Sequence, residues 1–264
     1  MPRRIVIHAG FHKTGATAIQ QTLKLNRPLL KPVLRSILPP GLRDVIGTAR
    51  EVSGTDDALA RATFHRRFGA FLSDLQPMPR RILCLSADGL SGQMAGRPAT
   101  PSYSAAVPLA QHMADCVKIA FPKTELVLFY TTCAAQDWLR NAYWEHVKSS
   151  SMTMDFDAFT TRFQGAANLD AVVDEIAAAT QVRVERAQFE DNLESPFGPA
   201  TPLLDLCDVP QDLRDRMTRP EPANPIADPS ILERMLEVNR TITGTEQRRA
   251  AKQEIFKGAD GAGT

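Results

Sequence analysis

The stretch that decides the fold is RIVIHAGFHKTGATAIQ, residues 4–20, which leads from a β-branched segment through a glycine-containing loop into a helical pattern. Residues 4–8 are typical of a buried strand in a parallel sheet, and residues 14–25 have helical spacing. In parallel α/β sheets, ligands bind in the loops that follow the carboxyl ends of the strands. The sequence therefore predicts an α/β protein with a ligand site at residues 10–17.

The residue types in this loop suit an anion. Gly10 and Gly15 let the backbone turn sharply and approach a ligand closely. The helix that follows presents free N–H groups and the positive end of its dipole. Lys13 adds a positive charge, while Thr14 and Thr17 add hydroxyl donors. We therefore expect a cradle for a phosphate or sulfate group of a nucleotide; the alternative is an ordinary strand-to-helix turn with a solvated lysine.

This loop differs from the Walker A phosphate loop. That motif has a glycine, four residues and then Gly-Lys-Ser/Thr, whereas here Lys13 precedes the second glycine. The apolar strand predicted at residues 124–130 is followed by two threonines and offers no Walker B aspartate. Magnesium-dependent phosphoryl transfer is therefore disfavoured.

The rest of the chain predicts alternating strands and helices. Further strands are expected at residues 81–86, 124–130 and 182–186. Helices are expected at residues 42–75, 105–120, 137–147, 155–163, 169–179 and 231–239. We predict one domain over residues 1–264, with a central parallel sheet flanked by helices, the first strand at its centre and a disordered tail at 258–264. The loop over residues 92–104, rich in Gly, Pro, Ser and Thr, is interpreted as an acceptor-side lid.

Composition limits the classes of partner. The formal net charge is +1, so no global field attracts nucleic acid or an anionic membrane, and any anion site must be local. No apolar stretch is long enough for a membrane span, and no signal peptide is recognised. The four cysteines form no CxxC pair and no zinc spacing. We expect a cytoplasmic protein without a metal.

Residues 8–20 resemble the 5′-phosphosulfate loop of sulfotransferases that use 3′-phosphoadenosine 5′-phosphosulfate (PAPS). The family pattern is close to Gly-x-x-Lys-Thr-Gly-Thr-Thr-x-x-Gln, and this chain departs from it at Ala16. Weaker similarity covers residues 85–92, 130–148, 182–191 and 224–239. The resemblance implies a sulfotransferase fold like that of P-loop nucleoside triphosphate hydrolases. It also implies sulfuryl transfer from PAPS to a hydroxyl of a carbohydrate or small metabolite, without a metal.

By resemblance, Lys13 stabilises charge on the departing nucleotide. The residues implied to bind the 5′-phosphate are Gly10, Thr14, Gly15, Ala16 and Thr17. Asp88, just past a strand, is one candidate for the base that takes the acceptor proton; its alternative role is a turn aspartate before Gly89. His12 is a second candidate base, and for it we favour the alternative of an exposed loop histidine.

The 3′-phosphate site departs most from the family pattern. Cys133 stands where the family has an arginine, and Asn141 stands where it has a serine. A thiol does not replace a guanidinium, which binds phosphate through a charged fork. Arg140 and Lys148 are the nearby cations that would compensate.

Two other classes of function follow from this departure. One alternative is a catalytically degenerate protein that keeps the fold as a nucleotide-binding or interaction module, and the other is an atypical small-molecule kinase. Trp138, Tyr143 and Trp144, at helical spacing, are interpreted as core residues rather than as an adenine platform. The sequence indicates neither the acceptor nor the oligomeric state.

Overall fold

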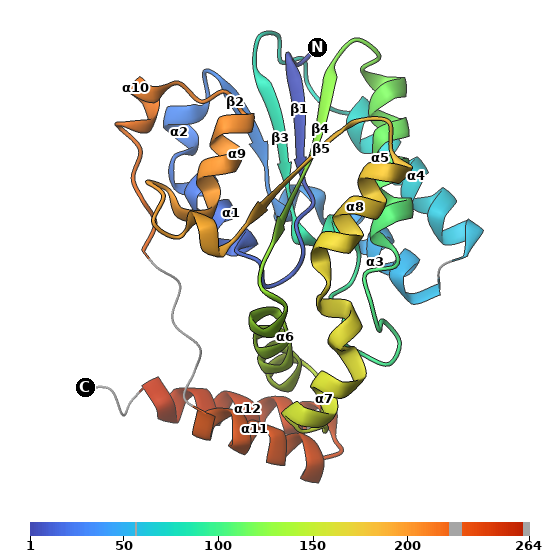
Figure 1. The fold of residues 1–264 in the computed structure, drawn as a ribbon, viewed down its shortest axis with the longest axis vertical. Coiled ribbons are helices and arrows are strands. Elements are labelled where there is room, and N and C mark those ends of the chain that lie inside the picture. Colours follow the sequence, from blue (N-terminus) through green and yellow to red (C-terminus); the bar gives the residue numbers. More distant parts are fainter. Residues whose placement is uncertain (56, 222–228, 261–264) are drawn as a thin grey trace.

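The computed structural model describes residues 1–55, 57–221 and 229–260, and its centre is a five-stranded parallel sheet (Figure 1). The strands are β1 (Arg4–His8), β2 (Leu34–Ile37), β3 (Ile82–Ser86), β4 (Glu125–Thr132) and β5 (Arg183–Gln188). Their order is β2-β3-β1-β4-β5, and all neighbours pair in parallel. The α/β class with a central parallel sheet and a central first strand is therefore confirmed.

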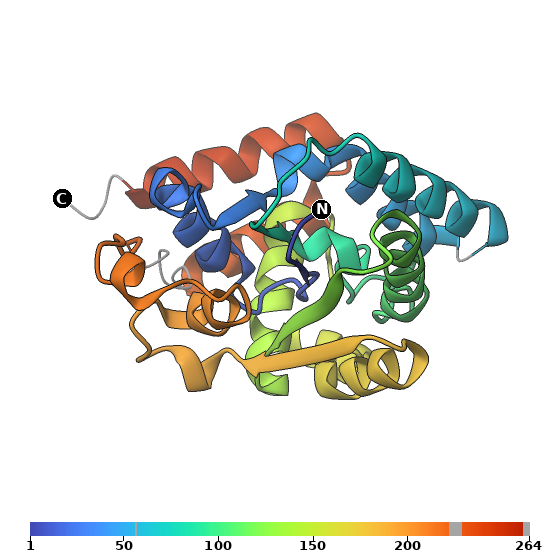
Figure 2. The ribbon, with the colours of Figure 1, turned by 90° about the horizontal axis from the view of Figure 1, so that it is seen from above.

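Helices cover both faces of the sheet (Figure 2). One face carries α1 (Ala16–Leu25), α2 (Arg27–Leu30) and α9 (Thr201–Leu206), with α10 (Gln211–Arg214) beside them. The other face carries α3 (Arg43–Thr55), α4 (Ala58–Ser73), α5 (Ala106–Ala120) and α8 (Leu169–Ala179). Alternate residues of one strand point to opposite faces, so in β1 Val6 packs toward α1 while Ile5 and Ile7 pack toward the second face.

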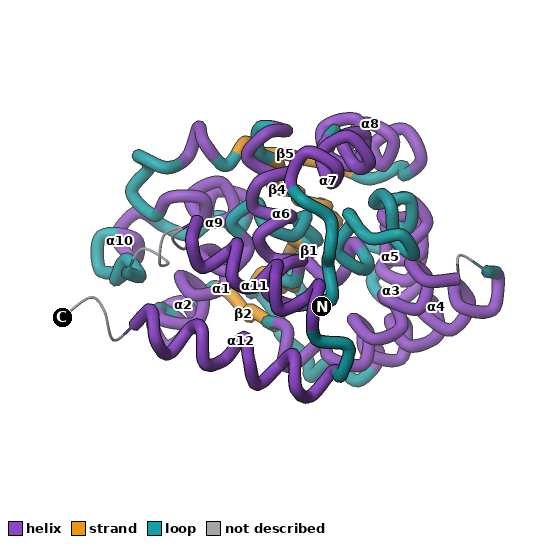
Figure 3. Tube along the Cα trace, turned by 90° about the horizontal axis from the view of Figure 1, so that it is seen from below, coloured by secondary structure: helices purple, strands orange, loops and turns teal. Residues whose placement is uncertain are grey.

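A third group of helices lies across the carboxyl ends of the strands (Figure 3). It consists of α6 (Ala135–Ser149), α7 (Phe156–Phe163), α11 (Pro229–Thr241) and α12 (Thr245–Asp260). Short 3-10 helices complete the connections: η1 (Pro39–Leu42), η2 (Asp88–Ser91), η3 (Gln164–Ala167), η4 (Glu190–Asn192) and η5 (Gly198–Ala200). The carboxyl ends of the strands are thus covered by α6, and α11 and α12 lie on the side of α6 that faces away from the sheet (Figure 1).

Several elements differ from the sequence prediction: the helix expected at residues 42–75 is divided into α3 and α4, and β2, α2, α9, α10 and α12 were not expected. The edge strand β2 was not expected, because it is only four residues long and lies between two proline-containing segments. The tail predicted over residues 258–264 begins within α12, which extends to Asp260; residues 261–264 lie outside the described residues. The buried side chains of Lys252 and Ile255 hold this helix against the rest of the fold.

The prediction that three aromatic residues belong to the core is confirmed by their burial. Trp138, Tyr143 and Trp144 are core residues. All four cysteines are buried and free. Of the segment 224–239, which resembles a family helix, residues 224–228 lie outside the described residues and the remainder forms most of α11. In the described ranges, no helix has the length and apolar character needed to cross a membrane.

Candidate functional site

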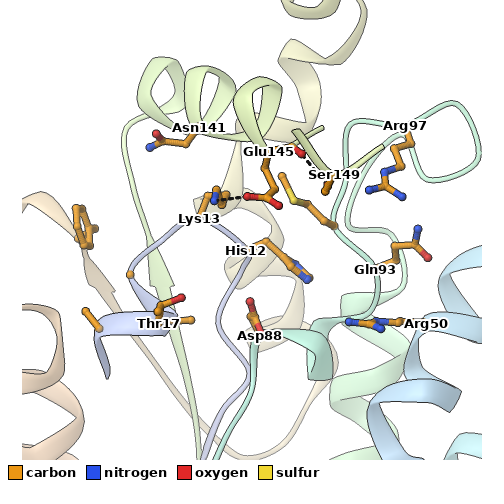
Figure 4. A pocket seen from close by; sticks show the side chains of 15 residues that line it. His12, Lys13, Thr17, Arg50, Asp88, Gln93, Arg97, Asn141, Glu145 and Ser149 are labelled. Carbon is orange, nitrogen blue, oxygen red and sulfur yellow. Dashed lines mark hydrogen bonds and ion pairs between the residues drawn. The ribbon is translucent and has the colours of Figure 1, made fainter. Parts of the chain in front are cut away.

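A cleft of about 700 Å³ lies at the carboxyl edge of the sheet, below β1. The loop after β1, the start of α1, η2, the segment after η2 and α6 all contribute to it, and Arg50 reaches it from α3. In Figure 4, Thr17 and Asn141 lie at one end of the cleft, and Arg50 and Arg97 lie at the other. We call these the α1 end and the arginine end.

The first turn of α1 faces the α1 end with its backbone donors free. Gly15 precedes the helix and no side chain caps it. The first intrahelical bond runs from the Ile19 N–H to the Gly15 carbonyl, at 3.2 Å. The N–H groups of Ala16, Thr17 and Ala18 precede this bond, and no hydrogen-bond partner for them is found within the described chain. Three N–H groups at a helix N-terminus suit an anion.

Two glycines make this loop possible for different reasons. Gly15 has a left-handed φ of 95°, and a Cβ at this position would lie 2.6 Å from Cδ2 of Phe189, which also lines the cleft. Gly10 lies deeper, where a Cβ would be 2.5 Å from Nε2 of the buried His8. Gly15 therefore shapes the surface that meets a ligand, whereas Gly10 allows the loop to pack on the sheet.

Lys13 lines the cleft and forms an ion pair with Glu145. Its own φ is 68°, a left-handed value that a non-glycine residue rarely adopts. Its Nζ lies 2.8 Å from Oε2 of Glu145 on α6, and the same oxygen lies 2.7 Å from Nζ of Lys148. Burial alone would raise the pKa of Glu145, but hydrogen bonds and charge from the two lysines outweigh it and lower this pKa to about 2. An anionic ligand would compete with an ionised carboxylate for Lys13.

The loop residue Thr14 serves the scaffold. Its buried hydroxyl donates to the Phe11 carbonyl at 2.7 Å and lies 2.7 Å from Oγ1 of Thr131 on β4. Of the predicted site residues, the cleft is lined by His12, Lys13, Gly15, Ala16, Thr17, Asp88 and Asn141. Gly10, Thr14 and Cys133 lie outside its lining.

The two candidate bases, His12 and Asp88, lie close together in the middle of the cleft (Figure 4). His12 is half-buried rather than exposed: its N–H donates to Oη of Tyr103 and its carbonyl accepts from Nε1 of Trp138, both at 3.2 Å. Burial lowers the pKa of His12 below its usual 6.5, and the charge of Asp88 opposes this in part. Asp88 starts η2 and accepts the Gly89 N–H at 3.0 Å. The pair therefore offers a neutral imidazole beside a carboxylate.

The start of α6, where the resemblance locates a 3′-phosphate, has the opposite character. Cys133 is buried, and its pKa is raised to about 12 by burial and by the charge of Glu190. The Ala134 N–H donates to Oε1 of Glu190 at 3.0 Å. The expected compensating cations are paired elsewhere, Arg140 with Asp137 and Lys148 with Glu145. The start of α1 therefore offers donors for an anion, whereas the residues around Cys133 do not fit a 3′-phosphate.

Sequence reasoning missed Glu145, Glu190, Arg50 and Arg97. Glu145 and Lys148 stand three positions apart on a helix, which predicts their pairing, but nothing local links Glu145 to Lys13, which is 132 positions away. Arg50 and Arg97 are isolated arginines in the sequence, and the tertiary fold brings both of them to the cleft.

No group of three or more His, Cys, Asp or Glu residues suited to a metal occurs in the described part of the chain. Comparisons with protein-family models, curated proteins and solved structures gave no match to this chain.

Proposed function

We propose that the cleft is the active site of a sulfotransferase with the P-loop-like sulfotransferase fold. The donor would be PAPS, and the acceptor a hydroxyl of a carbohydrate or small metabolite. One observation carries the proposal: Lys13 and the first turn of α1, whose three N–H groups have no partner among the described residues, line one end of a cleft whose middle holds two candidate bases. Phosphoryl and sulfuryl groups need such a set of donors, because negative charge grows on the bridging oxygen as the bond to sulfur breaks.

The donor side of the reaction uses α1. The N–H groups of Ala16, Thr17 and Ala18 would hold the 5′-phosphate oxygens, and Lys13 would leave Glu145 to contact the bridging oxygen. Asn141, at the same end of the cleft, would donate a hydrogen bond to the nucleotide. Because Glu190 occupies the start of α6, we expect the 3′-phosphate of PAPS to add little to affinity.

The acceptor side uses His12 or Asp88. With its proton on Nδ1, His12 donates to Oη of Tyr103, which lies 3.4 Å away, and its Nε2 is left to take the acceptor proton. The acceptor oxygen forms a bond to sulfur, the bond from sulfur to the nucleotide oxygen breaks, and the nucleotide leaves with the extra negative charge. This displacement requires no metal. Four buried free cysteines suit the cytoplasmic location that we include in the proposal.

A nucleotide-binding module without catalysis is the second candidate. The carboxylate of Glu190 and the ion pair of Lys13 with Glu145 favour it, because both reduce the positive potential that PAPS would meet. An atypical kinase is a further alternative, which would depend on ATP and magnesium.

The test is incubation of the protein with PAPS and a panel of hydroxyl acceptors, followed by chromatography for adenosine 3′,5′-bisphosphate and mass spectrometry for the sulfated product. Acceptor-dependent product that disappears in Lys13→Ala and persists in Lys24→Met, an exposed lysine at the far end of α1, supports the proposal. Phosphorylated product formed only with ATP and magnesium would establish the kinase instead. Nucleotide binding without any transfer would favour the binding module.

A further inference from the structure

A second pocket of about 530 Å³ adjoins the arginine end of the cleft, between the end of α6 and α12. Arg97 and Ser149 line both cavities, so the two pockets are adjacent and meet at these side chains. Volumes of this size each enclose a drug-sized ligand. A ligand whose reacting hydroxyl lies beside His12 and that extends beyond Arg97 would meet the second pocket.

The second pocket is lined by cations. Its basic lining residues are Arg97, Lys148, Arg248, Arg249 and Lys252, and no Asp or Glu is among its lining residues. Lys252 has a structural task, because its Nζ donates to the carbonyls of Val147 and Ser150 at 2.5 and 2.6 Å and so joins α12 to the end of α6. Arg249 is exposed, and no ion pair of it is found in the described ranges.

The arginine end of the cleft also presents cations, Arg50 and Arg97. Neither Arg50 nor Arg97 pairs with a carboxylate among the described residues. Nε of Arg97 lies 3.0 Å from Nδ1 of the buried His146, whose Nε2 lies 2.7 Å from the Ala95 carbonyl. If His146 carries its proton on Nε2, both hydrogen bonds are satisfied and the terminal nitrogens of Arg97 stay available. Arg97 is thus an oriented guanidinium between two cavities.

Taking the proposed sulfotransferase activity as the premise, we infer that the acceptor is an acidic oligosaccharide. Its reacting hydroxyl lies at His12 and Asp88, and its carboxylate or sulfate groups lie against Arg50, Arg97 and Arg249. Planar guanidinium groups match such anions with paired hydrogen bonds. Nucleic acid fits less well, because bases need stacking faces and Phe256 is the one aromatic residue in the lining of the second pocket.

The inference is tested by calorimetric titration with trigalacturonate, a heparin-derived tetrasaccharide, neutral maltotriose and an oligothymidylate. We expect at least one acidic oligosaccharide to bind and maltotriose not to bind. Arg50→Gln and Arg249→Gln should each weaken that binding by roughly 5- to 10-fold, since each removes a charged hydrogen-bond donor at a partly solvated site. The matched control is Arg66→Gln, which removes an exposed arginine of α4.

Three results would overturn the inference: failure of both acidic oligosaccharides to bind, equal binding of maltotriose, or tighter binding of the oligothymidylate. Titration of adenosine 3′,5′-bisphosphate into the same variants separates the inference from its premise. Unchanged nucleotide affinity in Arg50→Gln and Arg249→Gln supports an acceptor role, whereas a loss would assign these arginines to the donor. Arginine-dependent oligosaccharide binding without nucleotide binding would contradict the proposed activity, but it would support an acidic oligosaccharide site in the second pocket.

Discussion

The starts of α1 and α6 are two helix N-termini at the same end of the sheet, and they differ in the side chains that meet them. Each helix follows one of two adjacent parallel strands, β1 and β4. At the α1 start, no side chain accepts a backbone N–H among the described residues, whereas at the α6 start Oε1 of Glu190, 56 positions away, accepts the N–H of the N-cap residue Ala134. We call the first the open start and the second the closed start. The helix dipole is common to both. The side chains that meet each helix therefore decide which start can receive an anion, and this protein leaves one of the two open.

The largest expected effect concerns Lys13, the cation at the open start. We expect Lys13→Ala to lower the rate of sulfuryl transfer by about 100- to 1,000-fold, because it removes a donor that stabilises charge on the leaving oxygen. Steady-state kinetics with PAPS and an active acceptor measures this. Lys24→Met, at the exposed end of the same helix, should keep the wild-type rate. A similar loss in both variants would show that Lys13 has no particular role.

The next effect distinguishes the two bases. If His12 is the base, His12→Gln should lower the rate by about 100-fold, within the usual range for general-base catalysis. Burial lowers the pKa of His12, so the imidazole is neutral and active at pH 7 and becomes protonated and inactive at a pH below 6.5. The rate should therefore fall at acidic pH, and His12→Gln should abolish that fall. Retention of the acidic limb in His12→Gln, with its loss in Asp88→Asn, would assign the role to Asp88.

A smaller effect tests the shape of the open start. Gly15→Ala should weaken binding of adenosine 3′,5′-bisphosphate by about 10-fold and destabilise the fold by roughly 1–2 kcal/mol, because a left-handed φ disfavours any Cβ. This Cβ would also displace Phe189, whose ring lies 2.6 Å from its position. Calorimetry and thermal unfolding measure the two effects. Gly47→Ala is the matched control, since it lies in α3 where a Cβ meets nothing within 4 Å. Unchanged nucleotide affinity in Gly15→Ala would contradict the proposal that the 5′-phosphate binds at the start of α1.

The smallest effect concerns Glu190, the carboxylate at the closed start of α6. Glu190→Gln removes the negative charge at the N-terminus of α6 while keeping an oxygen for the Ala134 N–H. We expect affinity for adenosine 3′,5′-bisphosphate to rise about 3-fold relative to adenosine 5′-monophosphate, an electrostatic gain of the size seen for charges at helix ends. Parallel titrations of both nucleotides measure this ratio. A fall in the ratio would indicate that Glu190 assists the 3′-phosphate.

Much of the fold could be predicted because β1, β3 and β4 are apolar runs separated by helical patterns. The failures have local causes: β2 is four residues long, and α12 is too polar to show a clear apolar face. Its attachment depends on Lys252 capping the end of α6, a contact between residues more than 100 positions apart. Periodicity does not reveal such a contact.

The candidate site could be predicted only where chemistry is local in sequence. The loop from Gly10 to Thr17 carries its own signal, since its glycines, lysine and following helix are contiguous. The partners of that loop come from elsewhere, as Glu145 does for Lys13. Thr14 shows the converse: its residue type suggests a hydroxyl donor for a ligand, but its hydroxyl donates to the Phe11 carbonyl and lies against Oγ1 of Thr131.

The most direct test of the central claim is a calorimetric comparison of adenosine 5′-monophosphate with adenosine 3′-monophosphate, in wild type and in Lys13→Ala. An open start at α1 and a closed start at α6 predict that the 5′-phosphate binds, that the 3′-phosphate binds at least about 10-fold more weakly, and that Lys13→Ala removes the difference. Equal affinity for the two nucleotides, or an unchanged preference in Lys13→Ala, would contradict the account.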